Sequence, residues 1–288
     1  MNTPPSEWTV LTMLKWATSY FEEKGVRNPR FSIEWLLAHL LQVKRLDIYL
    51  MYDRPLVEEE LIKLRSLVKR RSSHEPLQYI TGSTDFLNTK IKVSEDVLIP
   101  RMETEQLVEM ILNNHASAKD YSLLDIGTGS GCIPIALKKS RKDWDVYGTD
   151  ISEKALRIAE ENAKSNEAEV TFLNDDLFNS VHVSENQKFD LIVSNPPYIL
   201  EEEKNSLDRE VKDFEPAAAL FCKSTALMFG AIKQFADQHL KENGYLYLEL
   251  HENHAQEVND LFSQPNWETA IHLDYDKKER FLISKKIK

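Results

Sequence analysis

A glycine loop between an apolar stretch and a helix-like stretch is the feature that most constrains the fold of this chain. Residues 123–126 are followed by Gly127, Thr128, Gly129, Ser130 and Gly131, and then by a second apolar segment. A short apolar run that ends in glycines and continues as a helix predicts the strand, turn and helix of an open parallel sheet. Ligands of such sheets bind at the carboxyl ends of the strands, where these glycines lie. Because glycine lets the backbone approach a ligand closely, the loop is the first candidate binding site.

Three ligand-binding loops share parts of this pattern, and two of them do not fit. A dinucleotide-binding loop requires its third glycine at position 132, which is Cys132, and a P-loop requires a Gly-Lys-Ser/Thr sequence that is absent here. The Gly-x-Gly-x-Gly pattern that remains is typical of S-adenosylmethionine-dependent methyltransferases, in which the loop approaches the methionyl part of the cofactor. The alternative is a tight turn that binds no ligand.

Acidic positions after the glycine loop agree with a cofactor site. Asp150 lies 19 residues beyond Gly131 and closes the next predicted strand, where a carboxylate can accept hydrogen bonds from both ribose hydroxyls. The alternative role for Asp150 is a helix cap. Asp176 and Leu177 follow the third predicted strand, at a suitable position for the adenine, although an Asp after a strand is commonly a turn former.

Four residues after the next predicted strand form a candidate catalytic motif, Asn195, Pro196, Pro197 and Tyr198. Consecutive prolines fix φ and remove two N–H donors, so the carbonyls of Asn195 and Pro196 are presented as acceptors by a stiff turn. With the Asn195 side-chain oxygen they can accept both hydrogens of an NH2 group, while Tyr198 offers a flat face to a planar amide or base. Two acceptors would turn the lone pair of such a poor nucleophile towards a sulfonium methyl group. Asn195 is also a candidate cofactor contact, and the alternative for the whole motif is an ordinary turn.

The remainder of the chain shows two patterns. Apolar residues recur at helical spacing in three segments of the first 80 or so residues, the second of which begins at Asn28 and Pro29. Within residues 86–99, apolar and polar residues alternate on both sides of 94–96, which predicts a β-hairpin. Strand-like and helix-like runs then alternate, which predicts a mostly parallel sheet covered on both faces. The expected strands are 121–126, 145–149, 170–173, 191–194, 245–250 and 281–284, and the expected helices are 133–139, 153–166, 225–241 and 255–263.

Taken together, the motifs resemble the HemK/PrmC family of release-factor glutamine methyltransferases over nearly the whole chain. The resemblance is carried by segments 30–38, 76–82, 98–105 and 215–220, together with the glycine loop and the Asn-Pro-Pro-Tyr motif. That motif alone is shared with amino methyltransferases that act on DNA and RNA, whereas the combination is more specific. The chain departs from the family pattern at Met102, where proline is usual, and at residues 249–254, which lack the glycine common there.

The resemblance implies an α/β fold with a helical N-terminal substrate-docking domain (1–82), a β-hairpin linker (83–101) and a Rossmann-like S-adenosylmethionine-dependent methyltransferase domain (102–288). It implies that residues 127–131, Asp150 and Leu177 contact S-adenosylmethionine. Residues 195–198 would hold the glutamine of the Gly-Gly-Gln loop of peptide-chain release factors, which is methylated on its side-chain amide nitrogen (N5), with S-adenosylhomocysteine as the product. The residues alone do not choose between glutamine and adenine, and a ribosomal protein is a further alternative substrate.

Charge and composition narrow the range of partners. The net charge is −11, and residues 91–288 carry 23 Lys+Arg against 36 Asp+Glu, which would repel a phosphate backbone. We therefore expect no direct nucleic-acid partner. The basic run 63–71 is interpreted as a solvated helix face, with a docking patch as the alternative. No apolar run approaches the about 20 residues of a membrane span, and the first residues do not resemble a signal peptide, so we expect a cytoplasmic, monomeric protein.

Metal and disulfide chemistry have little support in the sequence. Cys132 and Cys222 are the only cysteines, and they form no Cys-x-x-Cys pair. His251 and His254 lie three residues apart with two glutamates nearby, but histidines at a strand-to-helix junction are commonly solvated or capping residues. We therefore predict no metal site.

Overall fold

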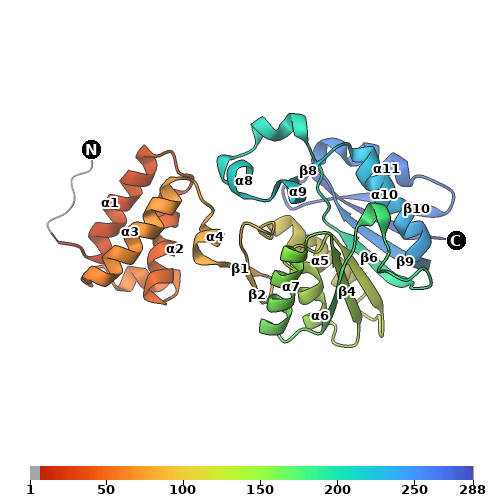
Figure 1. The fold of residues 1–288 in the computed structure, drawn as a ribbon, viewed down its shortest axis with the longest axis horizontal. Coiled ribbons are helices and arrows are strands. Elements are labelled where there is room, and N and C mark those ends of the chain that lie inside the picture. Colours follow the sequence, from red (N-terminus) through yellow and green to blue (C-terminus); the bar gives the residue numbers. More distant parts are fainter. Residues whose placement is uncertain (1–6, 288) are drawn as a thin grey trace. The chain divides into compact units, whose positions relative to one another are not determined.

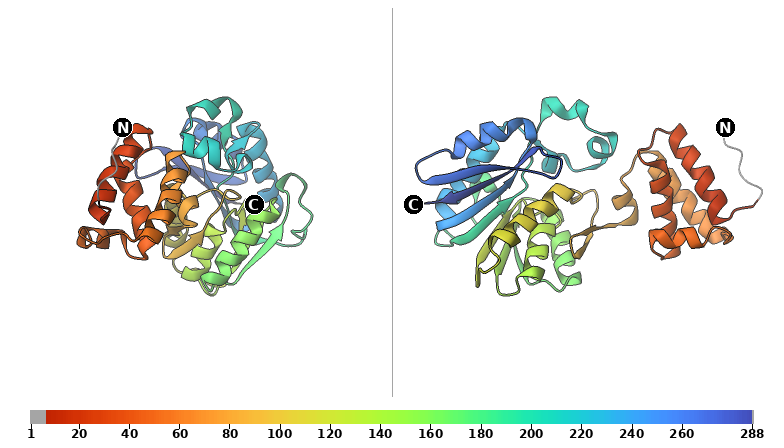
Figure 2. Two further views of the ribbon diagram at one scale, coloured as in Figure 1. Left: turned by 60° about the vertical axis from the view of Figure 1, so that its left-hand side comes forward. Right: turned by 180° about the vertical axis from the view of Figure 1, so that it is seen from behind.

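The computed structural model describes residues 7–287, which form two compact units. The first unit contains the described residues up to Gly82 together with Asp208–Phe214, and the second contains Ser83–Leu207 and the chain from Glu215 onwards (Figures 1 and 2). Within residues 7–287, no helix is both long and apolar enough to cross a membrane.

The first unit is a small helical bundle. Its elements are α1 (Val10–Glu23), α2 (Pro29–Leu41), the 3-10 helix η1 (Arg45–Leu50), α3 (Glu58–Ser72), α4 (Leu77–Thr81) and α8 (Arg209–Phe214). The apolar stripes predicted from the sequence form the core of this unit, since Leu14, Ile33 and Leu64 are fully buried. Pro29 begins α2 as predicted, because proline at the first helical position loses no hydrogen bond.

One helix of the first unit comes from far along the chain. Glu210 of α8 forms an ion pair with Arg71 of α3 at 2.7 Å, and the Arg71 side chain is only 3% exposed. The Arg71 guanidinium also donates to Ser32 Oγ at 3.0 Å, to the Glu75 carbonyl at 2.9 Å and to the Arg27 carbonyl at 3.2 Å. The prediction of a solvated face for residues 63–71 is therefore wrong for Arg71, because four acceptors compensate for its burial. Lys63 and Lys69 are exposed as predicted.

The second unit is built on a seven-stranded sheet with the strand order β10-β11-β9-β6-β3-β4-β5. The strands are β3 (Ser122–Ile126), β4 (Asp145–Asp150), β5 (Val170–Asn174), β6 (Phe189–Ser194), β9 (Leu240–Glu249), β10 (Trp267–Leu273) and β11 (Glu279–Lys286). Only β11 runs against its neighbours, so the predicted mostly parallel sheet is confirmed. β10 was not predicted from the sequence, because this edge strand buries little of its surface and has no clear apolar pattern.

Helices cover both faces of the sheet (Figure 2). The second unit contains α5 (Met102–Asn114), α6 (Cys132–Ser140), α7 (Glu153–Ser165), α9 (Ala217–Leu220), α10 (Thr225–His239) and α11 (Ala255–Phe262). Alternate residues of a strand point to opposite faces. Leu124 and Leu246 belong to the same buried cluster as Phe229 of α10. The next residue of β9, Tyr247, instead places its hydroxyl 3.2 Å from Asn114 Nδ2 at the end of α5.

The β-hairpin lies earlier in the chain than predicted. It consists of β1 (Ser83–Phe86) and β2 (Thr89–Lys92), so the turn is residues 87–88 and not 94–96. This turn lacks the glycine that usually marks a two-residue hairpin turn, and Leu87 takes a φ of 48° instead. Val97 and Ile99 are buried outside any strand. The alternation in residues 86–99 therefore reflects burial, and only its first part forms a strand.

The order of the strands brings two distant loops together. The chain leaves β3 for β4 and β5 on one side and returns to the other side of β3 with β6. Ile126 and Ser194, the last residues of β3 and β6, are register partners, and Ser194 Oγ donates to the Ile126 carbonyl at 2.7 Å. Ligands of open α/β sheets bind where the strand order reverses in this way. The loops that begin at residues 127 and 195 leave the sheet at this point.

We predict that Arg71→Ala lowers the free energy of unfolding by about 2–4 kcal/mol, because it leaves buried acceptors in the first unit without their donor. Glu210 is a quarter exposed and can be hydrated again, so the loss should stay below that of a fully buried pair. Urea denaturation followed by circular dichroism measures the change. Lys69→Ala on the exposed side of the same helix is the control and should change stability by less than about 0.5 kcal/mol. Equal effects of the two substitutions would contradict a structural role for Arg71.

Candidate active site

A cavity of about 320 Å³ lies at the carboxyl edge of the sheet in the second unit, within the range typical of small-molecule sites. Eight of the predicted site residues line it: Gly127, Gly129, Asp150, Asp176, Leu177, Asn195, Pro196 and Pro197. Thr128, Ser130, Gly131 and Tyr198 are not among the lining residues. The lining also includes Val97, Leu98, Pro216, Ala218 and Ala219. The structure therefore brings the glycine loop, the two acidic positions and the Asn-Pro-Pro turn to one cavity.

The three glycines of the loop all have positive φ but different surroundings. A Cβ atom on Gly127 or Gly129 would meet nothing within 4 Å, so both residues border open space. A Cβ atom on Gly131 would lie 3.0 Å from the Cβ of Ala159 in α7. The first two glycines keep the loop open towards the cavity, whereas the third allows close packing of the loop against α7. The amides of Gly127 and Thr128 donate to the Thr149 carbonyl at 2.9 and 2.8 Å, which fixes the loop to β4.

Asp150 connects the glycine loop to the end of β4. Its Oδ2 accepts from the Gly129 amide and its Oδ1 from the Ser152 amide, both at 2.8 Å. Ser152, and not Asp150, is the N-cap of α7. Burial raises the pKa of the Asp150 carboxyl, and the backbone donors oppose that rise. Each carboxylate oxygen has a second lone pair, so Asp150 can accept further hydrogen bonds from a ligand in the cavity.

The segment after β5 forms another side of the cavity. Asp176 caps the short 3-10 helix η2 (Leu177–Asn179), since its Oδ1 accepts from the Phe178 amide at 3.0 Å. Asp176 thus has the turn-forming role weighed in the sequence analysis and also lines the cavity. Leu177 and Phe178 line the cavity beside it, and Phe178 is about half exposed. These side chains give this end of the cavity the apolar surface that a planar ring requires.

The Asn-Pro-Pro-Tyr turn is held by two residues that the sequence analysis did not single out. Asn195 Nδ2 donates to Thr104 Oγ1 of α5 at 3.1 Å. Thr104 Oγ1 in turn donates to Glu249 Oε2 at 2.7 Å, and the Tyr198 hydroxyl donates to Glu249 Oε1 at 3.2 Å. Glu249 ends β9 and is 1% exposed; burial raises the pKa of its carboxyl to about 7. A glutamate that closes an apolar strand was the one sequence signal for this residue.

Another buried acid lies in β3, two residues before the glycine loop. Asp125 interrupts the apolar residues of β3 and is fully buried. Burial raises the pKa of its carboxyl to about 7; the Thr128 hydroxyl lowers it, and the charge of Asp150 raises it further. The acidic residue inside the apolar stretch Leu-Leu-Asp-Ile could have indicated a buried functional carboxyl. In strand prediction it counts only as a departure from the apolar pattern.

Glu215, which is 7% exposed, holds the part of the cavity lining that contains Leu98 and Pro216. Its carboxylate forms an ion pair with Arg101 and accepts from the Ile99 amide at 3.2 Å. These contacts join the segment before α5 to the segment that begins α9. Leu98 and Pro216, the neighbours of Ile99 and Glu215 in the chain, both line the cavity. A buried carboxylate thus fixes this part of the lining.

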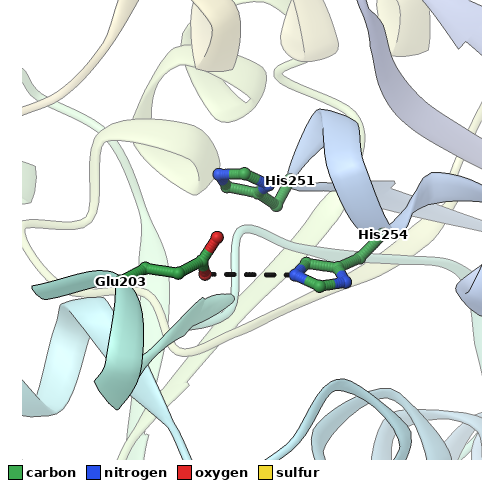
Figure 3. Close-up of side chains that lie close together, drawn as sticks. All are labelled: Glu203, His251 and His254. Carbon is green, nitrogen blue, oxygen red and sulfur yellow. Dashed lines mark ion pairs between the residues drawn. The ribbon is translucent and has the colours of Figure 1, made fainter. Parts of the chain in front are cut away.

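His251 and His254 lie close to Glu203 of the 3-10 helix η3 (Glu201–Ser206), as Figure 3 shows. One potential ligand atom from each residue lies within 4.8 Å of the others, and His254 Nε2 is 3.9 Å from Glu203 Oε2. However, His251 Nδ1 accepts from the Asn253 amide at 3.2 Å. The neutral ring therefore carries its proton on Nε2, and neither nitrogen has a free lone pair for a metal while that contact persists. The absence of a metal site stays a prediction.

The fold and the cavity together define the class of protein. The chain has the features of a Rossmann-like methyltransferase. These are a seven-stranded sheet with one reversed strand, a Gly-x-Gly-x-Gly loop after β3 and an Asn-Pro-Pro-Tyr turn after β6. Residues 102–265 match the methyltransferase small domain, and residues 12–82 match the PrmC N-terminal domain. The fold is similar to that of the 16S rRNA N2 G1207 methyltransferase of T. thermophilus in complex with AdoMet and guanosine, with a TM-score of 0.51 and 14% identity over 72% of this chain and 50% of that one.

Curated relatives identify the family. The chain is 42% identical to the release factor glutamine methyltransferase of Geobacter sulfurreducens, over 92% of this chain and 92% of the relative. It is 38% identical to that of Leptospira interrogans, over 96% and 97%, and 39% identical to that of Lactococcus lactis, over 88% and 94%. The chain belongs to the family of release factor glutamine methyltransferases.

We predict that Gly131→Ala destabilises the protein more than Gly129→Ala. Both changes place alanine at positive φ, which costs about 1–2 kcal/mol, but only the methyl group added at position 131 would press against α7, for a total of about 2–4 kcal/mol. Urea denaturation of the two variants gives the difference. Equal losses of stability would show that the contact with Ala159 does not constrain the loop.

Proposed function

We propose that this protein transfers the methyl group of S-adenosylmethionine to the side-chain amide nitrogen of the glutamine in the Gly-Gly-Gln loop of peptide-chain release factors. The observation that carries the proposal is the single cavity that contains both a glycine loop and an Asn-Pro-Pro turn, in a member of this family. A protein-bound glutamine amide and a cofactor methyl group must meet in one place, and this cavity provides it.

The cavity suits S-adenosylmethionine in shape and chemistry. Open space in front of Gly127 and Gly129 supports the binding of the methionyl part, with residues 127–131 as the contacting loop. We assign the ribose hydroxyls to Asp150, whose carboxylate has acceptor capacity left, and the adenine to Asp176 and Leu177. The Thr128 and Ser130 side chains are buried, so their contribution is through the backbone.

We assign the binding of the glutamine amide to the Asn-Pro-Pro-Tyr turn. The side-chain oxygen of Asn195 and the carbonyl of Pro196 would accept the two N–H hydrogens of the amide and direct the nitrogen lone pair. The same acceptors would stabilise the positive charge that grows on the nitrogen during transfer. Pro197 keeps the turn stiff. Tyr198 supports the turn through the hydrogen bond from its hydroxyl to Glu249.

The reaction balances without a metal or a redox partner. When bound, the cofactor supplies an electrophilic methyl group on a sulfonium sulfur. The amide nitrogen forms the new N–C bond as the S–CH3 bond breaks, and the electron pair of that bond stays on sulfur. The nitrogen then releases one of its two protons to solvent, which yields N5-methylglutamine and S-adenosylhomocysteine.

We assign the docking of the folded substrate to residues 1–82, which form most of the first, helical unit. A release factor presents one loop of a larger protein, so contacts outside that loop would increase the fraction of productive complexes. Exposed aromatic side chains support this assignment: Phe31 and Trp35 of α2 are 44% and 38% exposed, with ring centroids 6.0 Å apart, and Tyr49 of η1 is 44% exposed. Exposed aromatic residues are enriched at protein interfaces.

A nucleic-acid amino methyltransferase is the alternative function, since adenine offers a similar NH2 group. The basic run 63–71 is a poor surface for a nucleic acid, because Arg71 is buried and Arg70 is paired with Glu75. We therefore propose a protein substrate and no direct nucleic-acid partner. We also propose a monomeric, cytoplasmic enzyme, because translation termination takes place in the cytoplasm.

The experiment that tests this function is mass spectrometry of release factors incubated with the protein and S-adenosylmethionine, with a ribosomal-protein mixture, tRNA and DNA as competing substrates. We expect one added methyl group on the glutamine of Gly-Gly-Gln. Asn195→Ala should slow single-turnover methylation by about 100-fold or more, because it removes one of two preorganised acceptors. Asn195→Asp keeps an acceptor oxygen and should retain part of the activity. Preferential methylation of nucleic acid would refute the protein substrate, and near-normal turnover by Asn195→Ala would refute the assigned role of the motif.

We predict that Asp150→Ala weakens S-adenosylmethionine binding by about 1–3 kcal/mol, which is roughly 5- to 150-fold in Kd. The substitution removes the acceptor for the ribose hydroxyls and also the contact that holds Gly129. Calorimetric titration measures the affinity. Asp145→Ala, at the exposed start of the same strand, is the control and should bind normally. Unchanged affinity of Asp150→Ala would contradict the ribose assignment.

A further inference from the structure

The Asn195 side chain is the first member of a chain of hydrogen bonds that leads away from the cavity. Asn195 Nδ2 contacts Thr104 Oγ1, Thr104 Oγ1 contacts Glu249 Oε2, and Glu249 Oε1 contacts the Tyr198 hydroxyl. Thr104 and Glu249 are 3% and 1% exposed, so water does not compete for these contacts. The four side chains come from α5, from the end of β9 and from the turn itself, three separate segments of the second unit.

The donor and the acceptor of each hydrogen bond in this series can be assigned by starting from the Glu249 carboxylate. An ionised carboxylate accepts hydrogen bonds and donates none, so the Thr104 hydroxyl must donate its only proton to Glu249. The Thr104 oxygen then has only lone pairs left for Asn195. The NH2 end of the Asn195 amide must therefore face Thr104, and its oxygen must be at the other end, where Asn195 borders the cavity.

We propose that Thr104 and Glu249 are positioning residues that fix the orientation of the Asn195 amide, so that Asn195 presents an acceptor and not a donor to the NH2 group of the substrate. This inference rests on one part of the proposed function, namely that the group to be methylated is an NH2 group. Without the Thr104 hydroxyl, nothing in the chain of contacts distinguishes the two ends of the amide. The reversed amide would direct its own NH2 group at that of the substrate, which is repulsive.

The ionisation of Glu249 provides a second observable. Burial raises the pKa of its carboxyl to about 7, whereas Thr104, Tyr198 and Arg280 of β11 lower it and Glu103 of α5 raises it. The Cys132 thiol of α6 also faces this charge, but burial raises its pKa to about 12, so it stays neutral. A protonated Glu249 can donate to Thr104 and release the constraint on Asn195. The rate should therefore rise with pH through about 7 and stay constant above it.

The decisive variants are Thr104→Val, which keeps the shape without the hydroxyl, and Thr104→Ser, which keeps the hydroxyl. In single-turnover assays at saturating S-adenosylmethionine, we expect Thr104→Val to be about 5- to 20-fold slower, with Thr104→Ser within about 3-fold of wild type and cofactor affinity unchanged in both. Glu249→Gln has no carboxyl group to titrate, so it should lose the dependence on pH near 7. In the Asn195→Ala background, Thr104→Val should cause no further loss, because its effect passes through Asn195.

The side-chain amide signals of Asn195 in 15N-labelled protein test the inference without any substrate. We identify them by their absence from the Asn195→Ala spectrum, and expect them to shift in Thr104→Val but not in Thr104→Ser. A wild-type rate for Thr104→Val, an equal loss in Thr104→Ser, or the same loss in the Asn195→Ala background would overturn the proposal. If the wild-type protein methylates no glutamine, the proposed function fails, and the amide signals still decide whether Thr104 orients Asn195.

Discussion

The parallel pairing of β3 with β6 is the constraint on which the rest of the site depends. Ser194 and Ile126 are 68 positions apart in the chain, yet they are register partners, and Ser194 Oγ lies 2.7 Å from the Ile126 carbonyl oxygen. The glycine loop and the Asn-Pro-Pro turn start from the next residues, so this pairing alone makes them neighbours. A one-residue shift of β6 would reverse the faces of the sheet to which its side chains point and would separate the two loops. Apolar burial of β3 and β6, with Leu123, Leu124, Leu191 and Ile192 fully buried, keeps the register fixed.

Buried carboxyl groups surround this edge of the sheet and give it a distinct electrostatic character. Asp125 and Glu249 are buried and Asp150 is partly buried at the edge of the cavity, and burial raises the pKa of each carboxyl. The charge of Asp150 raises the pKa of Asp125 further, so a positive charge in the cavity would relieve the repulsion between these two groups. The proposed cofactor carries a sulfonium before transfer and a neutral thioether afterwards, so the same groups favour binding of the reactant over binding of the product. The polar contacts of the cavity and its charge thus agree with a single chemistry.

The two units are linked by more than a single connection. The chain passes from the first unit to the second after Gly82, returns at Asp208 and leaves again after Phe214. Within the first unit, Glu210 and Asp208 form ion pairs with Arg71 and Arg27. Residues 208–214, which come after the Asn-Pro-Pro-Tyr turn and η3, are therefore part of the helical unit. Removal of residues 1–82 would deprive α8 of these partners, so point substitutions on the helical surface test its docking role more cleanly than a truncation.

Local sequence patterns determined two kinds of element. These are helices and strands whose apolar residues recur at a regular spacing, and turns that contain a characteristic residue such as glycine or proline. The glycine loop, the double proline after β6 and the apolar stripes of α1 to α3 follow from backbone restrictions and from burial, which act over a few residues. Tertiary structure decided the rest. The hairpin turn at 87–88 lacks a glycine, β10 is a poorly buried edge strand, and one of the four acceptors of the buried Arg71 is Glu210 of the distant α8. Thr104 contacts Asn195 from 91 residues earlier in the chain, and Glu249, 54 residues after Asn195, contacts Thr104; no local pattern records such contacts. The sequence by itself therefore determined which groups are available to the site, whereas the sheet order decided which of them are hydrogen-bonded to one another, because that depends on strands paired over long distances in the chain.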